Sequence, residues 1–360
     1  MLYGCNSEQV KSDVINIYID NIKDSVTFDN IVEDYKFIEL SQENGFVLGD
    51  IAQVIIDNNN IYVSSNGVYC YDLKGNPLFK IDSKGHAKSE FIDCTSISIV
   101  GGIIYMYDKQ TRIIHKYNSS DGSFIENIRV PTVCRDLYRI ADLYIIDNLF
   151  PSDFYSGDAR IITTKDFQKT IGEYINNELY KMPFVDQVTY CNNSVVFANF
   201  QGNNLFCFDK YGCVEYIVKC KEALPIPLDV LEEYERSNKQ INDIYVYGLS
   251  NVYENNTYII GKFRFGNYFS FVYNKKNNNV IAFKQCNTCD YRFILNSVRG
   301  VYQDYFLYVI TSDDYDYLKE VYGFGTPLES THKDYNNQKV LFNHKVKGNP
   351  IIALYKYKIM

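Results

Sequence analysis

The chain has 360 residues, with 34 tyrosines, 23 phenylalanines and no tryptophan, and its formal net charge is -8. This length is ample for a large core, and the many aromatic and β-branched residues between Asn-rich turns favour strands. An acidic chain without a basic run argues against nucleic-acid binding, because neutralised phosphates supply most of that affinity. No apolar run approaches the roughly 20 residues of a membrane-spanning helix.

The first residues contain a short match to a lipid-attachment motif. Leu2-Tyr3-Gly4-Cys5 resembles the lipobox of bacterial lipoproteins, in which the cysteine thiol is acylated. The charged and apolar regions of a signal peptide do not precede Cys5, so the alternative is a chance match in a cytosolic protein. We expect residues 1–13 to form a tether with a lipid on Cys5, and residues 14–360 to form one domain.

A unit of four short strands runs from Val54 to Ile81. Its apolar and aromatic segments are separated by turns rich in Asn, Asp and Gly, which tolerate the backbone angles of tight turns. Four short antiparallel strands cannot bury both faces of their sheet alone, so the unit needs neighbours of the same kind.

Apolar triplets that follow polar turns mark the copies of this unit. Their spacing of about 40 to 60 residues matches propeller blades with their loops. The third copy is the weakest, and we expect Ala159–Thr164 and Thr170–Tyr174 to supply its outer strands. The triplets are Ile61-Tyr62-Val63, Ile104-Tyr105-Met106, Leu143-Tyr144-Ile145, Val195-Val196-Phe197, Tyr258-Ile259-Ile260 and Leu307-Tyr308-Val309.

A second marker repeats after the triplets. Tyr69-Cys70-Tyr71-Asp72, followed by Gly75, has the same spacing as Phe206-Cys207-Phe208-Asp209, followed by Gly212. The aromatic residues would pack between sheets, the Asp would start a turn, and the Gly would take a positive φ angle. We therefore interpret the recurring Asp as structural, not catalytic.

Two segments interrupt the repeats. Leu228–Ser237 has a helical pattern, so we expect a helical insertion around residues 225–240, either lying on the surface or covering the central opening. Ser312–Asp316 carries three carboxylates, which we interpret as a solvated acidic loop because the ligand spacing of a calcium loop is absent.

The cysteines and histidines do not predict a metal site. Most of the 10 cysteines lie in apolar segments, where a thiol acts as a small apolar side chain. Cys286 and Cys289 have the spacing of a redox pair or half a zinc site, but no second pair follows and the 4 histidines are scattered. A disulfide between these two cysteines stays open, and we predict no cofactor.

Sheets that are apolar on both faces favour a closed ring. Stacking the sheets in a closed ring buries every face, whereas a linear stack leaves the outer faces of its two end sheets exposed to solvent. The sequence thus predicts an all-β, six-bladed propeller of four-stranded antiparallel blades. Strands at Val14–Asp20 and Ile351–Ile359 would share one blade and close the ring. A β-solenoid and a pair of β-sandwiches are the alternatives.

The chain resembles the NHL-like six-bladed β-propeller lipoproteins of Gram-negative bacteria. The resemblance rests on the lipobox-like start, on Tyr35–Leu40, on Tyr71–Gly75 and on Gly348–Ile352. A Gly-Pro-Gly-Glu-Tyr-like turn of that family is replaced here by Lys84–Phe91, of which only the Glu-aromatic ending matches. The resemblance implies a propeller fold and a lipid-anchored place in the outer membrane or periplasm, but no particular activity.

Two functions remain open from the sequence. A non-catalytic module that binds an unknown protein, carbohydrate or peptide is favoured, because no nucleophile–base pattern, metal-spaced histidines or phosphate loop is present. The alternative is a propeller lyase or hydrolase acting on glycans or peptides in the central funnel. We name no catalytic residue. The residues that could hold an anionic or sugar ligand are Arg264, Tyr268, Arg292 and Arg299.

Overall fold

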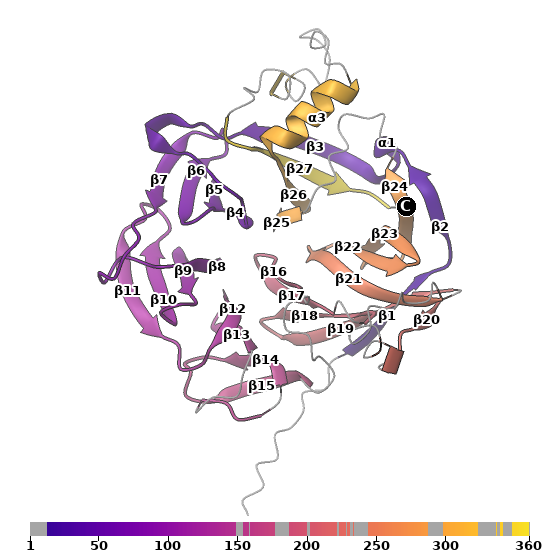
Figure 1. The fold of residues 1–360 in the computed structure, drawn as a ribbon, viewed down its shortest axis with the longest axis horizontal. Helices are drawn as coiled ribbons and strands as arrows, with labels where there is room; N and C mark the ends of the chain where they lie inside the picture. Colours follow the sequence, from indigo (N-terminus) through magenta and orange to yellow (C-terminus); the bar gives the residue numbers. More distant parts are fainter. Residues whose placement is uncertain are drawn as a thin grey trace, which may run out of the picture.

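The computed structural model shows six sheets arranged in a ring (Figure 1). It describes residues 13–148, 154–157, 159–176, 187–199, 202–221, 223–227, 229–230, 233, 244–286, 298–322, 336, 339–340 and 348–359. Cys5, Arg292 and Cys289 lie outside these residues, as does most of the segment for which a helix was predicted around residues 225–240.

Each sheet contains the four antiparallel strands of one blade, two sheets also have added edge strands, and the predicted fold class is confirmed. Blade 1 contains β4 (Gln53–Asp57), β5 (Asn60–Ser64), β6 (Val68–Asp72) and β7 (Pro77–Ile81). Blade 2 contains β8 (Cys94–Val100), β9 (Ile103–Asp108), β10 (Ile113–Asn118) and β11 (Phe124–Arg129). Blade 3 contains β12 (Cys134–Ile140), β13 (Leu143–Asn148), β14 (Ala159–Thr164) and β15 (Thr170–Asn176).

The other three blades include strands from the start of the chain or from an insertion. Blade 4 contains β16 (Gln187–Tyr190), β17 (Ser194–Ala198), β18 (Asn204–Asp209) and β19 (Gly212–Cys220), with β1 (Asp13–Ile19) added parallel to β19. Blade 5 contains β21 (Tyr245–Glu254), β22 (Tyr258–Phe265), β23 (Asn267–Asn274) and β24 (Val280–Cys286), with β2 (Ile22–Val26) and β20 (Leu224–Pro225) at its edges. Blade 6 contains β25 (Val298–Tyr302), β26 (Tyr305–Ile310), β27 (Ile351–Tyr357) and β3 (Val32–Glu39).

The repeat markers fall where the pattern places them. All six apolar triplets lie on the second strand of their blades, and the weak third repeat does form β14 and β15. Asp72 accepts hydrogen bonds from the backbone N–H groups of Lys74 and Asn76 at 2.8 and 2.9 Å, so it does start the turn before β7. Gly75 has the expected positive φ of 83°.

The strand predicted to close the ring is the wrong one. Val14–Asp20 does not share a blade with the last strand, because β1 pairs with the outer strand of blade 4. The closing strand is β3, whose residue Phe37 lies opposite Ala353 of β27. A short helix, α1 (Phe28–Ile31), leads into β3, and the ring of its first residue, Phe28, packs against Tyr35 and Tyr355. The aromatic cluster therefore fastens β3 to the last strand.

The acidic segment near the end of blade 6 is helical, which corrects the loop prediction. Helix α3 spans Ser312–Tyr322, and Asp313 and Asp314 lie in its first turn. Thr311 caps it, because its Oγ1 accepts from the Asp314 N–H at 3.3 Å, while the Thr311 N–H donates to Asp314 Oδ2 at 2.9 Å. Thr-x-x-Asp is a capping-box-like pattern that the sequence displays. The carboxylates are placed there by the helix start, where they also complement its dipole.

Adjacent blades are joined at their first strands, which surround the ring axis (Figure 1). Between blades 6 and 1, a Cβ on Gly300 would lie 1.8 Å from the carbonyl oxygen of Val54, so only glycine permits this approach. Between blades 1 and 2, the Gln53 carboxamide bonds both the N–H and the C=O of Ile97, at 3.3 and 3.0 Å. These contacts make the inner wall of the ring rigid.

Aromatic side chains fill part of the ring centre. Tyr138 of blade 3 stacks on Tyr190 of blade 4 with ring centroids 5.7 Å apart, and the Tyr190 hydroxyl donates to the Ile99 carbonyl of blade 2 at 3.1 Å. Asn192, in the next turn, donates to the Ile56 carbonyl of blade 1 at 3.3 Å. The first hairpin of blade 4 thus reaches across the axis to blades that are not its neighbours.

Candidate functional site

We call one face of the ring the entry face. At this face the first strand of each blade begins and its second strand ends. In five of the six blades the last residue of the second strand, or the one after it, is polar; in blade 5 the second strand ends at Phe265 and Gly266 follows. In blade 1, Ser65 Oγ accepts from Gly49 N–H at 2.9 Å, and in blade 6 Thr311 caps α3. The equivalent residues, counted four places after the start of each triplet, are Ser65, Asp108, Asp147, Asn199, Lys262 and Thr311.

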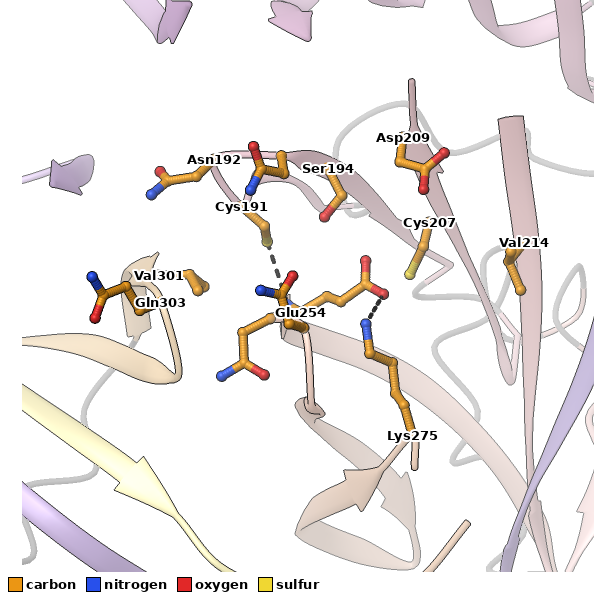
Figure 2. Close-up of a pocket in the computed structure, with 13 residues that line it drawn as sticks. Cys191, Asn192, Ser194, Cys207, Asp209, Val214, Glu254, Lys275, Val301 and Gln303 are labelled. Carbon is orange, nitrogen blue, oxygen red and sulfur yellow. Dashed lines mark hydrogen bonds and ion pairs between the residues drawn. The ribbon is translucent and has the colours of Figure 1, made fainter. Parts of the chain in front are cut away.

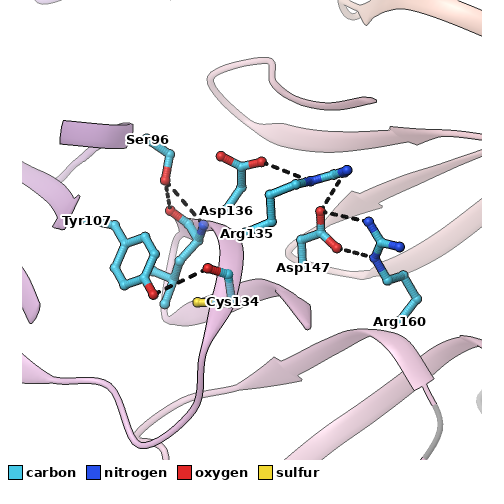
Figure 3. A network of polar contacts seen from close by, with 8 residues as sticks. Ser96, Tyr107, Cys134, Arg135, Asp136, Asp147 and Arg160 are labelled. Carbon is cyan, nitrogen blue, oxygen red and sulfur yellow. Dashed lines mark hydrogen bonds and ion pairs between the residues drawn. The ribbon is translucent and has the colours of Figure 1, made fainter. Parts of the chain in front are cut away.

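Blade 3 departs from this pattern. Asp147 is fully buried and lies between two arginines: Arg160 Nε donates to its Oδ1, and Arg135 Nη2 is 2.6 Å from its Oδ2 (Figure 3). Arg160 is itself 1% exposed, and its guanidinium lies 5.9 Å from the centre of the Phe197 ring of blade 4. Removing a carboxylate and two guanidiniums from water costs free energy, so such a cluster stabilises the fold little. It is therefore a candidate for a functional site.

A β-bulge brings a second carboxylate to this cluster. Cys134 pairs with Asn148 and Leu137 pairs with Ile146, so Arg135 and Asp136 both oppose the single residue Asp147. Bulges of this kind re-aim side chains and recur beside active sites. Asp136 Oδ2 is 3.5 Å from Arg135 Nε, an ion-pair contact that is too long for a good hydrogen bond.

The environment of Asp136 favours its protonated form. Burial raises the pKa of its carboxyl to about 7, and the negative charge of Asp147 adds to the rise. The positive charges of Arg135, Lys109 and Arg160 oppose it. A carboxyl with a pKa near 7 can hold or release a proton at neutral pH, as a general acid or base requires.

A pocket of about 620 Å³ opens on the entry face beside blades 5, 6 and 1. Lys262 and Arg299 supply two cations, and Asp50, Asp313 and Asp314 supply three carboxylates. In the part of the chain that the structure describes, neither Lys262 nor Arg299 forms an ion pair, so both charges are available to a ligand. Burial raises the pKa of the Tyr253 phenol, and the charge of nearby Arg299 opposes part of this rise.

The predicted ligand-binding residues are not brought together as one group. Arg299 lines the pocket on the entry face, whereas Arg264 does not. Arg264 lies opposite Tyr268 in blade 5, with its guanidinium 5.3 Å from the Tyr268 ring and 5.6 Å from the Tyr247 ring. Tyr268 is 54% exposed, so this stack faces solvent. Arg292 lies outside the described residues.

A smaller pocket of about 160 Å³ lies at the opposite face, where first and second strands are joined (Figure 2). Glu254 Oε1 pairs with Lys275 Nζ at 2.7 Å, and Glu254 N–H donates to Cys191 Sγ at 3.3 Å. Burial raises the pKa of the Cys191 thiol to about 12 and moves that of Cys207 upward as well, which favours the protonated, less reactive form of both thiols at neutral pH. At roughly 30 Å³ each, about five water molecules would fill this space.

Neither pocket is a metal centre by its residues. Among the described residues, no group of three or more His, Cys, Asp or Glu side chains is arranged to hold a metal ion. The seven described cysteines are free thiols, and six of them are buried, as expected for small apolar side chains. The side chain of Cys286 and all of Cys289 lie outside the described part, so the question of a disulfide between them stays open.

Comparison with known proteins identifies the family. A family model described as a 6-bladed beta-propeller matches residues 5–308. The chain belongs to this family. No curated protein matches the sequence.

The chain is similar to several solved structures, of which one, from Bacteroides fragilis, shares its fold over nearly the whole chain. A Bacteroides fragilis structure, described as a candidate exported protein, is 15% identical, with a TM-score of 0.76 over 96% of this chain and 100% of that one. Apo AztD from Citrobacter koseri is 11% identical, with a TM-score of 0.40 over 71% of this chain and 70% of that one. The designed protein Ika8 is 8% identical, with a TM-score of 0.39 over 76% and 71%.

The blade 3 cluster of this propeller was missed by sequence reasoning, although one signal points to it. An aspartate follows the triplet at the same offset in blades 2 and 3, which suggests a purely structural role for both. The informative signal is Arg160, a charged residue inside the apolar strand Ala159–Thr164, because a buried arginine requires a buried carboxylate partner. Its carboxylate partner Asp147 is 13 positions earlier in the chain, and Arg135, which contacts the same carboxylate, is 25 positions earlier. Neither can be found without the sheet register.

Proposed function

We propose that this β-propeller is a non-catalytic binding or scaffolding module of the cell envelope, with its ligand in the 620 Å³ pocket of the entry face. The observation that carries the proposal is the lining of this pocket. Cations from blades 5 and 6 face a cavity that is also bordered by carboxylates from blade 1 and from α3. A short peptide suits such a lining better than a neutral glycan, because its two ends carry opposite charges.

The envelope location rests on two supports. The lipobox-like Leu2–Cys5 would anchor the chain through a lipid on Cys5, as in the NHL-like propeller lipoproteins of Gram-negative bacteria that it resembles. The Bacteroides fragilis neighbour is described as a candidate exported protein. Within the described ranges no helix has the length and apolar character to cross a membrane. Mass spectrometry of the protein made in a Gram-negative host from its complete gene tests the anchor: an acylated Cys5 supports it, and an unmodified Cys5 contradicts it.

Binding is tested by calorimetry against a panel of short peptides and oligosaccharides. Arg299→Ala should abolish the binding of any peptide that the unchanged protein binds, because the cation that holds its carboxyl end is lost. Arg129→Ala is the matched control, since Arg129 is exposed at the end of β11 and far in sequence from the pocket lining. Peptide binding that survives Arg299→Ala, or an absence of binding to every member of the panel, contradicts the proposal.

A propeller lyase or hydrolase is the second candidate, and Asp136 is the observation that favours it. Its carboxyl, with a pKa raised to about 7 by burial, could serve as the proton donor or acceptor that such chemistry needs. Incubation with the same panel would then release new reducing ends or amino termini, and Asp136→Asn would stop the release. Products that form equally well with Asp136→Asn would exclude this role for Asp136.

A further inference from the structure

We propose that the smaller pocket, of about 160 Å³, binds a neutral six-membered ring that carries several hydroxyls, such as a pyranose sugar or a cyclitol (Figure 2). The Asn255 amide donates to one hydroxyl of the ring, and the Glu254 carboxylate accepts from another. This second site goes beyond the proposed function, because it lies on the opposite face of the propeller and shares no lining residue with the 620 Å³ pocket.

Three consecutive blades build the pocket from the turns between their first and second strands. Asn192 and Asn193 lie between β16 and β17, Asn255 and Asn256 lie between β21 and β22, and Gln303 lies between β25 and β26. Asn193, Asn256 and Gln303 are exposed and border the opening, whereas Asn255 is buried. Asn is common in tight turns because of its backbone angles, and three adjacent turns thereby gather side-chain amides in one place.

Asn255 has a hydrogen-bond donor that the fold does not use. Its side-chain oxygen accepts from the N–H groups of Thr257 and Tyr258, at 2.9 and 2.6 Å, so the turn fixes which end of the amide is the oxygen. The residue is 6% exposed, and its Nδ2 donates to no group in the part of the chain that the structure describes. Buried donors in folded proteins almost always have a partner. Because Asn255 lines the pocket, that partner is an acceptor atom of the molecule that occupies it.

The charged groups of the pocket favour an uncharged ligand. Lys275 Nζ is 2.7 Å from Glu254 Oε1, and Asp209 Oδ1 accepts from two N–H groups of its own turn. One positive and two negative charges sum to -1, which disfavours an anion, and the described residues offer no cluster that could hold a metal ion. The Glu254 carboxylate has about four acceptor positions, of which Lys275 and the Cys207 thiol use two. A hydroxyl can donate to this carboxylate and can also accept from an amide.

The size of the pocket admits one ring. An engineered cavity of about 150 Å³ with an apolar lining binds benzene, so a space of about 160 Å³ has room for one six-membered ring. Here the lining is polar, and Asn255 and Glu254 require an acceptor and a donor from the ligand. The ring must therefore carry hydroxyls, which is the chemistry of a monosaccharide or a cyclitol.

The test uses neutral rings with the full-length protein. Glucose, galactose, mannose and myo-inositol are the hydroxyl-bearing probes, and saturation-transfer NMR with titration gives the Kd of each. We expect at least one of them to bind. Tetrahydropyran-2-methanol has the same ring as the hexoses without its ring hydroxyls, and it should not bind, because a site that pairs with hydroxyls rejects an analogue that lacks them. The proposal is overturned if none of the four probes binds, or if the analogue binds equally well.

Asn255→Asp keeps the turn and removes the donor. Its carboxylate still accepts from Thr257 and Tyr258, but the atom in place of Nδ2 cannot donate, so probe binding should weaken by at least about tenfold. Asn118→Asp makes the same change at a turn of blade 2, where the side-chain oxygen accepts from Ser120 N–H at 3.0 Å, and should bind as the unchanged protein does. Unchanged binding by Asn255→Asp, or an equal loss in Asn118→Asp, refutes the inference.

Two further variants keep the test decisive. Should Asn255→Asp fold poorly, as judged by its thermal midpoint, Val214→Phe decides, because Val214 is half-buried on β19 and a larger side chain there would occupy the pocket. Probe binding that survives Val214→Phe contradicts the proposal. Arg299→Ala should lose peptide binding and keep probe binding, so this site and the proposed function can fail independently. Loss of probe binding in Arg299→Ala but not in Asn255→Asp would assign the probe to the 620 Å³ pocket and refute the inference.

Discussion

Blades 2 and 3 carry an aspartate at the same place, and the two side chains have different tasks. Asp108 accepts hydrogen bonds from the backbone N–H groups of Gln110 and Thr111, at 3.0 and 3.2 Å, and from Ile92 at 2.8 Å. Asp147 instead faces Arg135 and Arg160. Both carboxylates are buried.

The comparison shows that the repeat pattern determines the position of a residue but not its role. The role depends on which donors or charged groups the neighbouring strands place beside that residue. Blade 2 supplies backbone donors and the neutral ring of His115, whereas blade 3 supplies guanidiniums from β12 and β14. A turn cap is needed wherever a turn is built, whereas a cluster of buried charges rarely stabilises a fold more than apolar residues would, which makes the blade 3 cluster a functional candidate.

The largest expected difference comes from removing each charge while keeping the side-chain shape. Asp147→Asn should cost about 3–5 kcal/mol of unfolding free energy, because two buried guanidiniums lose their counter-charge. Asp108→Asn keeps one carbonyl oxygen as a cap and loses one acceptor, which should cost about 1–3 kcal/mol. Urea unfolding of both variants measures the difference. Equal costs would mean that the two aspartates do the same work.

The next effect concerns the pH dependence of blade 3. Because the pKa of Asp136 is raised from 3.8 to about 7, the folded chain keeps a proton that the unfolded chain releases over this range. The contribution of Asp136 to the free energy of unfolding therefore falls as pH rises from about 4 to 7, by at most about 1.4 kcal/mol per pH unit. Asp136→Asn should be more stable than the unchanged protein at pH 8, by about 1–3 kcal/mol, with no such advantage below pH 4. Unfolding free energies across this range would contradict the account if the two curves ran parallel.

Blade 2 should show the opposite dependence, through His115. Burial lowers the pKa of this imidazole below 6.5, and the Asp108 charge offsets part of that effect. The unfolded chain then binds a proton that the folded chain does not, so stability is lost as pH falls through 6.5. His115→Gln should remove this loss, while His86→Gln, at an exposed position, should not. Thermal midpoints at pH 7 and pH 5 provide the measurement.

The smallest effect on stability is expected at Arg299, whose role we place in binding. Its guanidinium forms no ion pair in the described part of the chain, so Arg299→Ala should change the unfolding free energy by less than about 0.5 kcal/mol. A loss above about 2 kcal/mol in urea unfolding would show that Arg299 supports the fold, and would remove it as a ligand-binding residue.

The architecture could be predicted because it follows from patterns of residues that are close together in the chain. Triplets such as Ile61–Val63 and turns such as Asp72–Gly75 are determined by residues that are adjacent in the chain, so their number and order follow from the sequence. Ring closure was predicted correctly in kind but with the wrong strand. Both β1 and β3 alternate apolar residues, and only the packing of Phe28 on Tyr355 selects β3 as the partner of β27.

The candidate site could be predicted only in part, because it depends on contacts between distant residues. Arg299 is at the pocket, but the partnership of Arg135 with Asp147 arises from a bulge, and bulges have no reliable local signal. The capping of α3 by Thr311 could have been recognised from Thr-x-x-Asp, and the acidic residues there were misinterpreted because no helix was considered.

The protonation of Asp136 tests the central claim most directly, because it distinguishes a poised functional carboxyl from a structural one. Carbon-13 labelling of the aspartate carboxyl groups allows their titration to be followed by NMR, with Asp136→Asn identifying the resonance. We predict one resonance with a midpoint near pH 7. A spectrum in which every aspartate titrates below about pH 5 would contradict the account.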